Sequence, residues 1–441
     1  MKRGSYEQFF KGKKVTVMGL GLLGRGVGDS RFLATHCDEV IVTDKKNEAQ
    51  LDRSVKELDG LSNIILRLGE HRMEDFEKRD FIIKSAGVPY DSEYILHAKE
   101  DGVPVYMTAA QVVSIIMQTL PDIIIIGVTG TRGKSTVTQL VAHILKEHGM
   151  RTHVGGNIRG VANLPLLDEV EDGDYLVLEL DSWQLQGFGD MKISPHIAVF
   201  TSFMDDHMNY YKNDKELYFN DKANIYRHQN EYDVLITSPQ AKDEILKRDK
   251  RQSLVEASPR KISMKLIGSH NEMAAGLAYE VAVQCGLSDE EVDSAIATFK
   301  AVDGRLEDMG LFNDVRVFND NNATTGDAVV AGIKAIEETF GKKPIVITGG
   351  ADKGLPKDEY ERYLEGHTQD VVYLAGTGTD SISLPKKHLF EKLEDCIKES
   401  FTIAKEGDII LFSPGFASFS KYFNNEYERN DLFVEELKKY T

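Results

Sequence analysis

The sequence predicts an α/β protein of three domains, each built on a mostly parallel sheet with flanking helices. Short apolar runs alternate with stretches of helical periodicity along the whole chain, and this alternation is typical of parallel sheets. The 441 residues would fill roughly two to four domains of ordinary size. Two segments, Thr108–Ala110 and Ala301–Arg305, look like hinges. We therefore expect domains at residues 1–108, 109–302 and 303–441.

Composition argues against several classes of protein. The chain carries 71 acidic and 53 basic residues, whereas a protein that binds nucleic acid normally presents a basic field. Cys37, Cys285 and Cys396 are far apart, so we expect reduced thiols rather than a disulfide framework or a zinc site. The sequence shows no signal peptide and no apolar run of membrane-spanning length. We expect a cytoplasmic monomer that binds neither nucleic acid nor membrane.

The N-terminal domain is expected to be Rossmann-like. Lys14–Met18 is predicted to be a strand, Gly19–Gly24 has the pattern G-x-G-x-x-G, and a second strand, Glu39–Thr43, ends at Asp44. Asp44 stands twenty residues after the last glycine of the turn, where an acidic residue contacts a ribose. Two glycines in the intervening segment weaken a helix, so a turn without a ligand stays the alternative to a nucleotide site.

The rest of the N-terminal domain repeats the strand-and-helix pattern. Strands are expected at Asn63–Arg67 and Asp80–Lys84, and residues 91–107 supply one more helix and strand. Ser85–Pro89 follows the end of a strand, which is where ligands sit in an open α/β sheet.

The central domain opens with a predicted phosphate-binding loop. Ile123–Ile126 is a buried strand, a glycine-rich turn ends in Lys134 and Ser135, and an amphipathic helix runs to Gly149. Backbone N–H groups at the start of such a helix attract phosphate. Lys134 would reach the terminal phosphates of a nucleotide, and the Ser135 hydroxyl would bind Mg²⁺. The strict pattern G-x-x-x-x-G-K-[ST] fails at Val128, so a chance Lys-Ser after an ordinary turn is the alternative.

Polar side chains follow the next strands of the central domain. Tyr175–Leu178 ends at Glu179, which would give a second contact to Mg²⁺. His196–Phe200 is followed by His207, which an aspartate precedes, and Lys222 lies in a helix expected over residues 214–228. The plainer alternatives are a surface glutamate, a structural histidine and a solvated lysine. Because polar side chains follow three successive strands, we favour a functional site at this edge of the sheet.

Residues 238–265 are charged and lack periodicity, so we expect a surface loop and weak strands there. A helix opened by Gly268–Asn271 should run to Gln284, and another should span Asp289–Lys300.

The C-terminal domain repeats the α/β alternation. Its charged candidates at the carboxyl ends of the sheet are Arg305, Asp320 and Lys353. Its strands are expected at Val315–Phe318, Pro344–Thr348, Val371–Ala375 and Asp408–Phe412.

Short motifs follow one another in a definite order along the chain. They are G-L-G-L-L-G at 19–24, T-G-T-R-G-K-S at 129–135, G-G-N-I at 155–158, E-L-D-S-W-Q-L at 179–185, D-D-H-M at 205–208, D-K-A-N-I-Y at 221–226, S-H-N at 269–271, G-R-L-E at 304–307, D-N-N-A-T at 320–324 and S-P-G-F-A-S-F at 413–419. This ordered set resembles the Mur ligases, the ATP-dependent amino-acid ligases of peptidoglycan assembly, and the resemblance runs nearly end to end. Within the family, the first and last of these motifs look most like the members that add D-glutamate.

The resemblance implies a Rossmann-like N-terminal domain that binds a UDP substrate, a central P-loop domain that binds ATP and Mg²⁺, and a Rossmann-like C-terminal domain that binds an amino acid. It implies catalytic roles for Lys134, Glu179, His207 and Lys222. Ser135, Glu179, His207 and Lys222, the last as a carbamylated lysine, would organise the metal. The implied ATP contacts are Gly130, Thr131, Gly133, Lys134, Ser135, Thr136, Asn271, Arg305 and Asp320.

The implied substrates are UDP-N-acetylmuramoyl-L-alanine and an amino acid, with D-glutamate favoured, joined through an acyl phosphate. A different acceptor amino acid, addition of glutamate to a folate, and a nucleotide-binding regulatory protein without turnover are the alternatives. The nucleotide features of residues 19–44 argue against the folate. The implied contacts are Leu22, Leu23, Asp44, Asn157 and Gln184 for the UDP substrate, and Thr324, Lys353, Ser418 and Tyr422 for the amino acid.

The chain departs from the family pattern near the phosphate loop and the acceptor site. Arg132 stands where the family usually has Asn, Asp181 where it has Ser, and Asn322 where the D-glutamate enzymes have Lys. The segment N-N-E-Y-E-R-N at 424–430 stands where the family usually has K-N-F-E-Q-R-G.

Overall fold

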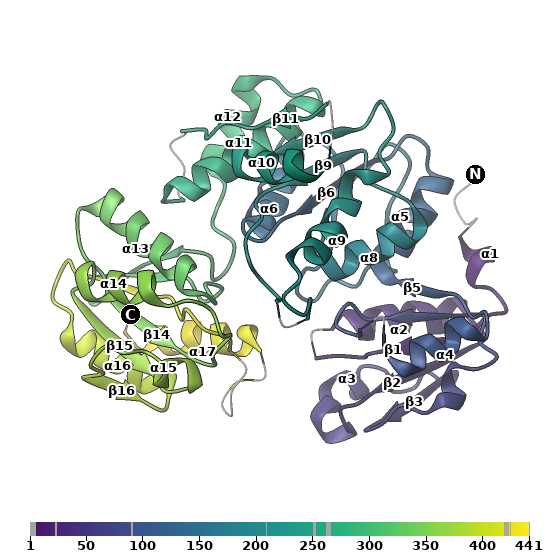
Figure 1. Cartoon of the computed structure of the whole chain (residues 1–441), viewed down its shortest axis with the longest axis horizontal. Helices are drawn as coiled ribbons and strands as arrows, with labels where there is room; N and C mark the ends of the chain where they lie inside the picture. The colour runs from purple at the N-terminus through teal and green to yellow at the C-terminus, as the bar shows by residue number, and fades with distance from the viewer. Residues whose placement is uncertain are drawn as a thin grey trace. The chain divides into compact units, whose positions relative to one another are not determined.

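The computed structural model describes residues 6–22, 24–89, 91–208, 210–249, 253–261, 266–418, 423 and 425–440. The chain divides into two compact units (Figure 1). The first comprises Met1–Ser258 with Gly276–Val292 and contains two sheets; the second comprises Pro259–Ala275 with Asp293–Thr441 and contains the third. Helices flank each sheet, so the predicted α/β architecture with three mostly parallel sheets is confirmed. Among the described residues, no helix is long and apolar enough to cross a membrane.

The first sheet has the strand order β3-β2-β1-β4-β5, and all neighbours are parallel. From β1 the chain passes to β2 and β3 on one side, and it then crosses to β4 on the other side of β1. This reversal of strand order places a crevice at the carboxyl ends of β1 and β4. The elements are α1 (Glu7–Phe10), β1 (Lys14–Met18), α2 (Arg25–His36), β2 (Glu39–Asp44), η1 (Glu48–Leu51), α3 (Asp52–Lys56), β3 (Ile64–Leu68), η2 (Met73–Phe76), β4 (Phe81–Lys84), α4 (Glu93–Glu100) and β5 (Val105–Met107).

The second sheet has the order β11-β10-β9-β6-β8-β7, again with parallel neighbours. Its central strand, β6, is apolar on both faces because helices cover both sides. The elements are α5 (Thr108–Thr119), β6 (Ile124–Thr129), α6 (Lys134–Glu147), β7 (Thr152–Gly156), α7 (Leu166–Glu169), β8 (Tyr175–Glu179), α8 (Ser182–Met191), β9 (Ile197–Phe200), α9 (Lys215–Arg227), β10 (Val234–Thr237), α10 (Pro239–Arg248), β11 (Val255–Glu256), α11 (Ser269–Gln284) and α12 (Asp289–Thr298).

The expectation of a loop with weak strands over residues 238–265 was wrong for its first half, which forms α10. Ser238 caps this helix by accepting a hydrogen bond from Ala241 N, and Pro239 occupies the first helical position. Only Ala241 and Ile245 are buried, so the apolar stripe was too thin to reveal the helical period. The segment expected as the first hinge is likewise helical, because α5 begins at Thr108.

The third sheet has the order β12-β13-β17-β14-β15-β16. All neighbours are parallel except β12, which pairs antiparallel with β13 and carries an irregularity between Asp308 and Gly310. The elements are β12 (Glu307–Phe312), β13 (Val315–Asn319), α13 (Gly326–Phe340), β14 (Ile345–Gly349), α14 (Asp358–Gly366), β15 (Asp370–Leu374), α15 (Thr377–Asp380), β16 (His388–Phe390), α16 (Leu393–Ile403), β17 (Ile409–Phe412), α17 (Glu426–Leu437) and η3 (Lys438–Tyr440).

Candidate active site

The loop between β6 and α6 has the geometry of a phosphate cradle. Gly133, at the position before the helix, has φ of 84°, a left-handed conformation that favours glycine. Lys134 opens α6 and turns back over the loop, where its Nζ lies 3.0 Å from the carbonyl oxygen of Gly130 and 3.3 Å from that of Thr131. Ser135 and Thr136 follow in the first helical turn, where backbone N–H groups are available to an anion.

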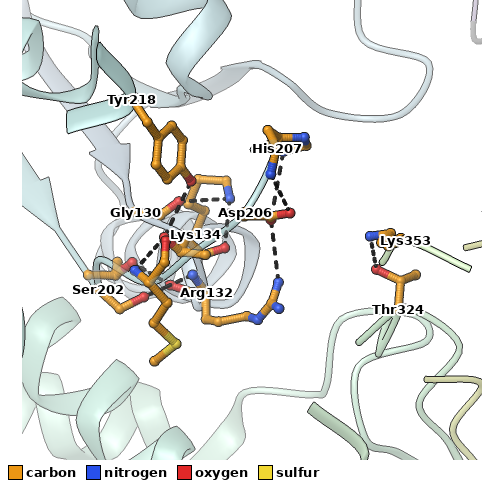
Figure 2. A network of polar contacts seen from close by, with 12 residues as sticks. Gly130, Arg132, Lys134, Ser202, Asp206, His207, Tyr218, Thr324 and Lys353 are labelled. Carbon is orange, nitrogen blue, oxygen red and sulfur yellow. Dashed lines mark hydrogen bonds and ion pairs between the residues drawn. The ribbon is translucent and has the colours of Figure 1, made fainter. Parts of the chain in front are cut away.

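The segment after β9 lies against this loop. Thr131 N donates to Ser202 O at 2.8 Å, and Arg132 N donates to Ser202 Oγ at 2.8 Å. The Arg132 guanidinium is 3.6 Å from the Asp206 carboxylate, so the arginine that replaces the family's asparagine contacts the residue beside His207. Figure 2 shows the network that these contacts form around Gly130 and Lys134.

Lys222 comes to the same loop from α9. Its side chain is buried, its Nζ lies 3.0 Å from the carbonyl oxygen of Gly130, and it also lies 4.9 Å from the centre of the Tyr218 ring. Burial lowers the pKa of Lys222 to about 7, and the positive charge of Lys134 acts in the same direction. Lys222 is therefore not the solvated charge of the plainer alternative. With this pKa, a large fraction of the Lys222 side chain is a neutral amine near neutral pH.

Glu179 ends β8, the strand beside β6, and its register partner on β6 is Val128. The residue is 5% exposed, and its carbonyl oxygen accepts a hydrogen bond from Asn157 N at 2.7 Å. Asp181 caps α8: its carboxylate accepts from Gln184 N at 2.7 Å, while the Gln184 side chain accepts from Asp181 N. The aspartate that replaces the usual serine thus orders the turn after Glu179.

His207 has a left-handed backbone, with φ of 54°, and a side chain that is 40% exposed. Its Nε2 lies 3.7 Å from an Asp206 carboxylate oxygen, and its ring centre is 4.8 Å from that of Trp183. Trp183 belongs to α8, so the indole joins the turn after Glu179 to the histidine. Among the described residues, no three His, Cys, Asp or Glu side chains gather as a ready-made metal site.

A cavity of about 200 Å³ lies in the crevice between β1 and β4. Gln184 from α8 reaches its wall, and Leu22 contributes to it with 38% of its surface exposed. Asp44 is buried beside the glycine turn and accepts hydrogen bonds from Gly21 N at 3.0 Å and Lys46 N at 2.9 Å. Leu23, predicted to contact the UDP substrate, lies outside the described residues.

The second unit holds the remaining predicted nucleotide contacts. Asp320 follows β13, is half-buried, and accepts hydrogen bonds from Leu306 N and Ser413 Oγ, both at 3.0 Å. Burial raises the pKa of Asp320 to about 7, and the charge of Arg305 opposes that rise. Asn271, in the first turn of α11, donates to Ile267 O at 2.8 Å.

The predicted amino-acid contacts also lie in the second unit. Lys353 Nζ donates to Thr324 Oγ1 at 2.9 Å (Figure 2). Both residues line a small hollow with Gly415 and Phe416. Ser418, which follows Phe416 closely in the sequence, is buried. Tyr422 lies outside the described residues.

Sequence reasoning missed four residues that shape these sites: Arg25, Lys84, Trp183 and Arg429. Lys84 lines the cavity from the end of β4, and burial lowers its pKa to about 8. Arg429 on α17 is fully buried and donates to Asn321 Oδ1 at 2.8 Å. The sequence did offer a signal for Trp183, because this residue lies within a motif that ends a strand. The contacts of Arg25 and Arg429, in contrast, join distant parts of the sequence.

Comparison with known proteins agrees with this geometry. Residues 128–280 match the family described as the Mur ligase middle domain, and residues 13–107 match the Mur ligase MurD-like N-terminal domain. UDP-N-acetylmuramoylalanine–D-glutamate ligase of Roseiflexus sp. (strain RS-1) is 31% identical, over 98% of this chain and 99% of its own. Two solved structures from Thermotoga maritima share the fold. UDP-N-acetylmuramate-alanine ligase MurC has a TM-score of 0.63 at 19% identity, covering 97% of this chain and 100% of its own. MurF ligase in complex with ADP has a TM-score of 0.61 at 16% identity, covering 92% and 96%.

Proposed function

This chain belongs to the Mur ligase family, and from that premise we propose that it joins D-glutamate to UDP-N-acetylmuramoyl-L-alanine with cleavage of ATP to ADP and phosphate. The product would be a peptidoglycan precursor, made in the cytoplasm, where both ATP and nucleotide sugars are found. One observation within the structure carries the proposal: Lys134 and Lys222, from the P-loop and from α9, meet at the carbonyl oxygen of Gly130.

Amide formation from a free carboxylate requires activation. The γ-phosphoryl group of ATP passes to the alanyl carboxylate of the nucleotide sugar, which gives an acyl phosphate and ADP. The amino group of D-glutamate attacks the acyl carbon and loses a proton, and the tetrahedral intermediate expels phosphate to leave the amide. Lys134 would offset the negative charge on the transferring oxygens, and the N–H groups of the first turn of α6 would hold the neighbouring phosphates.

The side chains at this edge of the second sheet fit Mg²⁺. Ser135 and Glu179 offer the hard oxygen atoms that this ion prefers, and His207 would orient ligands around it. Lys222 would add a further carboxylate as a carbamate, because its pKa of about 7 leaves a neutral amine that combines with carbon dioxide and loses a proton. When bound, the ion supplies positive charge that stabilises the phosphoryl oxygens.

The remaining assignments divide between the two units. Lys353 is a cation beside the Thr324 hydroxyl, which suits the carboxylates of a dicarboxylic acceptor. The assigned residues are Leu22, Leu23, Asp44, Asn157 and Gln184 for the nucleotide sugar; Gly130, Thr131, Gly133, Thr136, Asn271, Arg305 and Asp320, with Lys134 and Ser135, for ATP; and Thr324, Lys353, Ser418 and Tyr422 for the amino acid.

A panel of D- and L-amino acids, assayed with UDP-N-acetylmuramoyl-L-alanine and ATP, tests the function through phosphate release. We expect release that depends on both cosubstrates and is fastest with D-glutamate. A faster rate with another amino acid would mean that this amino acid, and not D-glutamate, is the acceptor. ATP binding without phosphate release under any combination would favour the regulatory alternative. Light scattering of the purified chain checks the expected monomer.

A further inference from the structure

We propose that Arg25 binds the diphosphate of the nucleotide-sugar substrate and links the bound diphosphate to the turn that supports Glu179. This inference rests on the proposed function, because it assigns a ligand group to one residue of the first-substrate site. Arg25 opens α2 and lines the cavity between β1 and β4. Its Nη1 donates to Asn157 Oδ1, a side chain that follows β7 in the second sheet.

The contact between Arg25 and Asn157 follows from the close approach of α2 to residues 162–164. A Cβ atom on Gly28 would meet the Ala162 side chain, so glycine is required for this approach. Asp29 then accepts hydrogen bonds from Asn163 N at 3.0 Å and Leu164 N at 2.9 Å. Arg25 lies one turn earlier on the same helix and is therefore held in a fixed place between the two sheets.

The charged side chains of the cavity wall leave a positive surplus. They are Arg25, Lys84 and Asp29. Burial raises the pKa of Asp29 to about 7, so its charge is incomplete near neutral pH. Lys84, whose Nζ lies 2.8 Å from Val88 O, adds a second cation whose pKa is about 8. In a chain of net charge −18, a cavity with two cations attracts an anionic group.

Arginine suits a diphosphate because its planar guanidinium presents several N–H donors at once. The hydrogen bond to Asn157 uses one of the two terminal nitrogens. Asn157 N in turn donates to Glu179 O at 2.7 Å, and Glu179 pairs in register with Val128 of β6. Arg25 therefore connects the first-substrate cavity to the strand ends that carry the P-loop and Glu179.

Calorimetric binding of UDP and of uridine to the full chain tests the contact with the diphosphate. We expect the wild type to bind UDP more tightly than uridine. R25Q should weaken UDP binding by about tenfold or more and leave uridine binding unchanged, because only the contact with the diphosphate is lost. R25K should recover part of the UDP affinity. R31Q, at an exposed arginine of the same helix, is the matched control and should change neither affinity.

The outcomes separate this inference from the proposed function. If wild-type protein binds neither UDP nor uridine, the assignment of a nucleotide-sugar substrate fails. If the wild type prefers UDP and R25Q, with a normal melting temperature, keeps that preference, Arg25 does not bind the diphosphate. R25K serves as the reference if R25Q does not fold, and equal UDP affinity of R25K and wild type would also overturn the proposal that the guanidinium binds the diphosphate.

A double-mutant cycle tests the link to Asn157. If Arg25 and Asn157 act as a unit, the loss of UDP affinity in R25Q/N157A should be smaller than the product of the two single losses by about threefold or more. Losses that multiply would refute the coupling. In turnover, R25Q should raise the KM for the nucleotide sugar and leave the KM for D-glutamate unchanged.

Discussion

Lys134 and Lys222 donate to one acceptor: the Nζ atoms of both side chains lie 3.0 Å from the carbonyl oxygen of Gly130. Two cations at one carbonyl repel each other, and Lys222 is the buried member of the pair. Burial lowers the pKa of Lys222 to about 7, and the positive charge of Lys134 acts in the same direction. The protein thus places two amines side by side at the P-loop, and the buried one has a pKa near neutrality.

The first prediction is that Lys222 works as a carbamate. K222A should be inactive, and a small carboxylic acid should restore part of its rate by replacing the lost carboxylate. Carbon-13 NMR with labelled carbon dioxide should detect a carbamate in the wild type and not in K222A. K247A, at an exposed lysine of α10, should behave as wild type in both measurements. Full activity in K222A would count against the carbamate.

The second prediction is that K134A loses turnover and keeps its fold. Removal of the cation that faces the transferring phosphoryl group should lower kcat by about a thousandfold or more. The melting temperature should change little, because the carbonyl oxygen of Gly130 keeps its hydrogen bond from Lys222 when Lys134 is removed. K146A, at an exposed lysine near the end of α6, is the control. Near-normal kcat in K134A would refute the role of the loop.

The third prediction uses Trp183, the single tryptophan of the chain. Its ring centre lies 4.8 Å from that of His207 and 5.4 Å from that of Tyr210, and its Nε1 has no hydrogen-bond partner among the described residues. Binding of a non-hydrolysable ATP analogue with Mg²⁺ should change the tryptophan emission. H207A should abolish most of that change. W183F should lower kcat by about three- to tenfold, the usual worth of an aromatic contact.

An emission change of equal size in H207A would show that the indole does not report on the histidine. The nucleotide affinity of H207A, measured separately by calorimetry, excludes loss of binding as the cause.

The fourth prediction concerns pH and Asp29. Burial raises its pKa from 3.8 to about 7, so across that window the folded state keeps a proton that the unfolded chain has lost. The contribution to stability is therefore greatest at low pH and falls as pH rises toward 7. D29N, which cannot ionise, should melt above the wild type at both about pH 5 and about pH 8.5, with the larger gap, of a few kcal/mol at most, at the higher pH.

Thermal unfolding of D29N and of D38N, at an exposed aspartate just after the same helix, checks this sign. D38N should follow the wild type at both pH values. A lower melting temperature of D29N than of wild type at the higher pH would contradict the assignment.

The fifth prediction concerns Arg429, which is fully buried and donates to neutral acceptors: Asn321 Oδ1 at 2.8 Å, Asn321 O at 2.9 Å and Phe416 O at 3.4 Å. Burial lowers the pKa of Arg429 to about 10. R429M should cost about 3 kcal/mol of stability, because it leaves buried acceptors without donors.

Because Asn321 and Phe416 flank the predicted amino-acid contacts, R429M should also raise the KM for D-glutamate. R362M, at an exposed arginine of α14, should change neither quantity. Denaturant unfolding and acceptor titration are the measurements. An unchanged acceptor KM in a destabilised R429M would limit Arg429 to a structural role.

Much of the fold was predictable because short apolar runs mark strands that are buried on both faces. The P-loop was predictable because strand, glycine turn and helix are contiguous in sequence. The burial of Lys222 had a local signal as well: Tyr218 and Tyr226 stand four residues to either side of it on the buried face of α9. A solvated charge was the alternative interpretation of Lys222, and this spacing argues against that alternative.

Other features depend on contacts that no local pattern encodes. Arg25 meets Asn157 across 132 positions, and the meeting depends on how α2 lies against residues 162–164. β12 was missed because residues 301–305 were interpreted as a hinge and residues 304–307 as a motif. The strand begins at the end of that motif and pairs antiparallel with β13, the next strand in sequence. α10 was missed because its many charged residues suggested a loop, while the helix-start signals of Ser238 and Pro239 were overlooked.

The irregular pairing of β12 has a consequence for the behaviour of concentrated protein. This strand forms an outer border of its sheet and carries Leu311, which is 61% exposed. A regular border with an exposed leucine would offer a template on which a foreign strand could add and fibrils could begin. The break between Asp308 and Gly310 disturbs the even spacing of backbone amides and carbonyls that the addition of a foreign strand needs. We therefore expect this irregularity to disfavour fibril formation at high protein concentration.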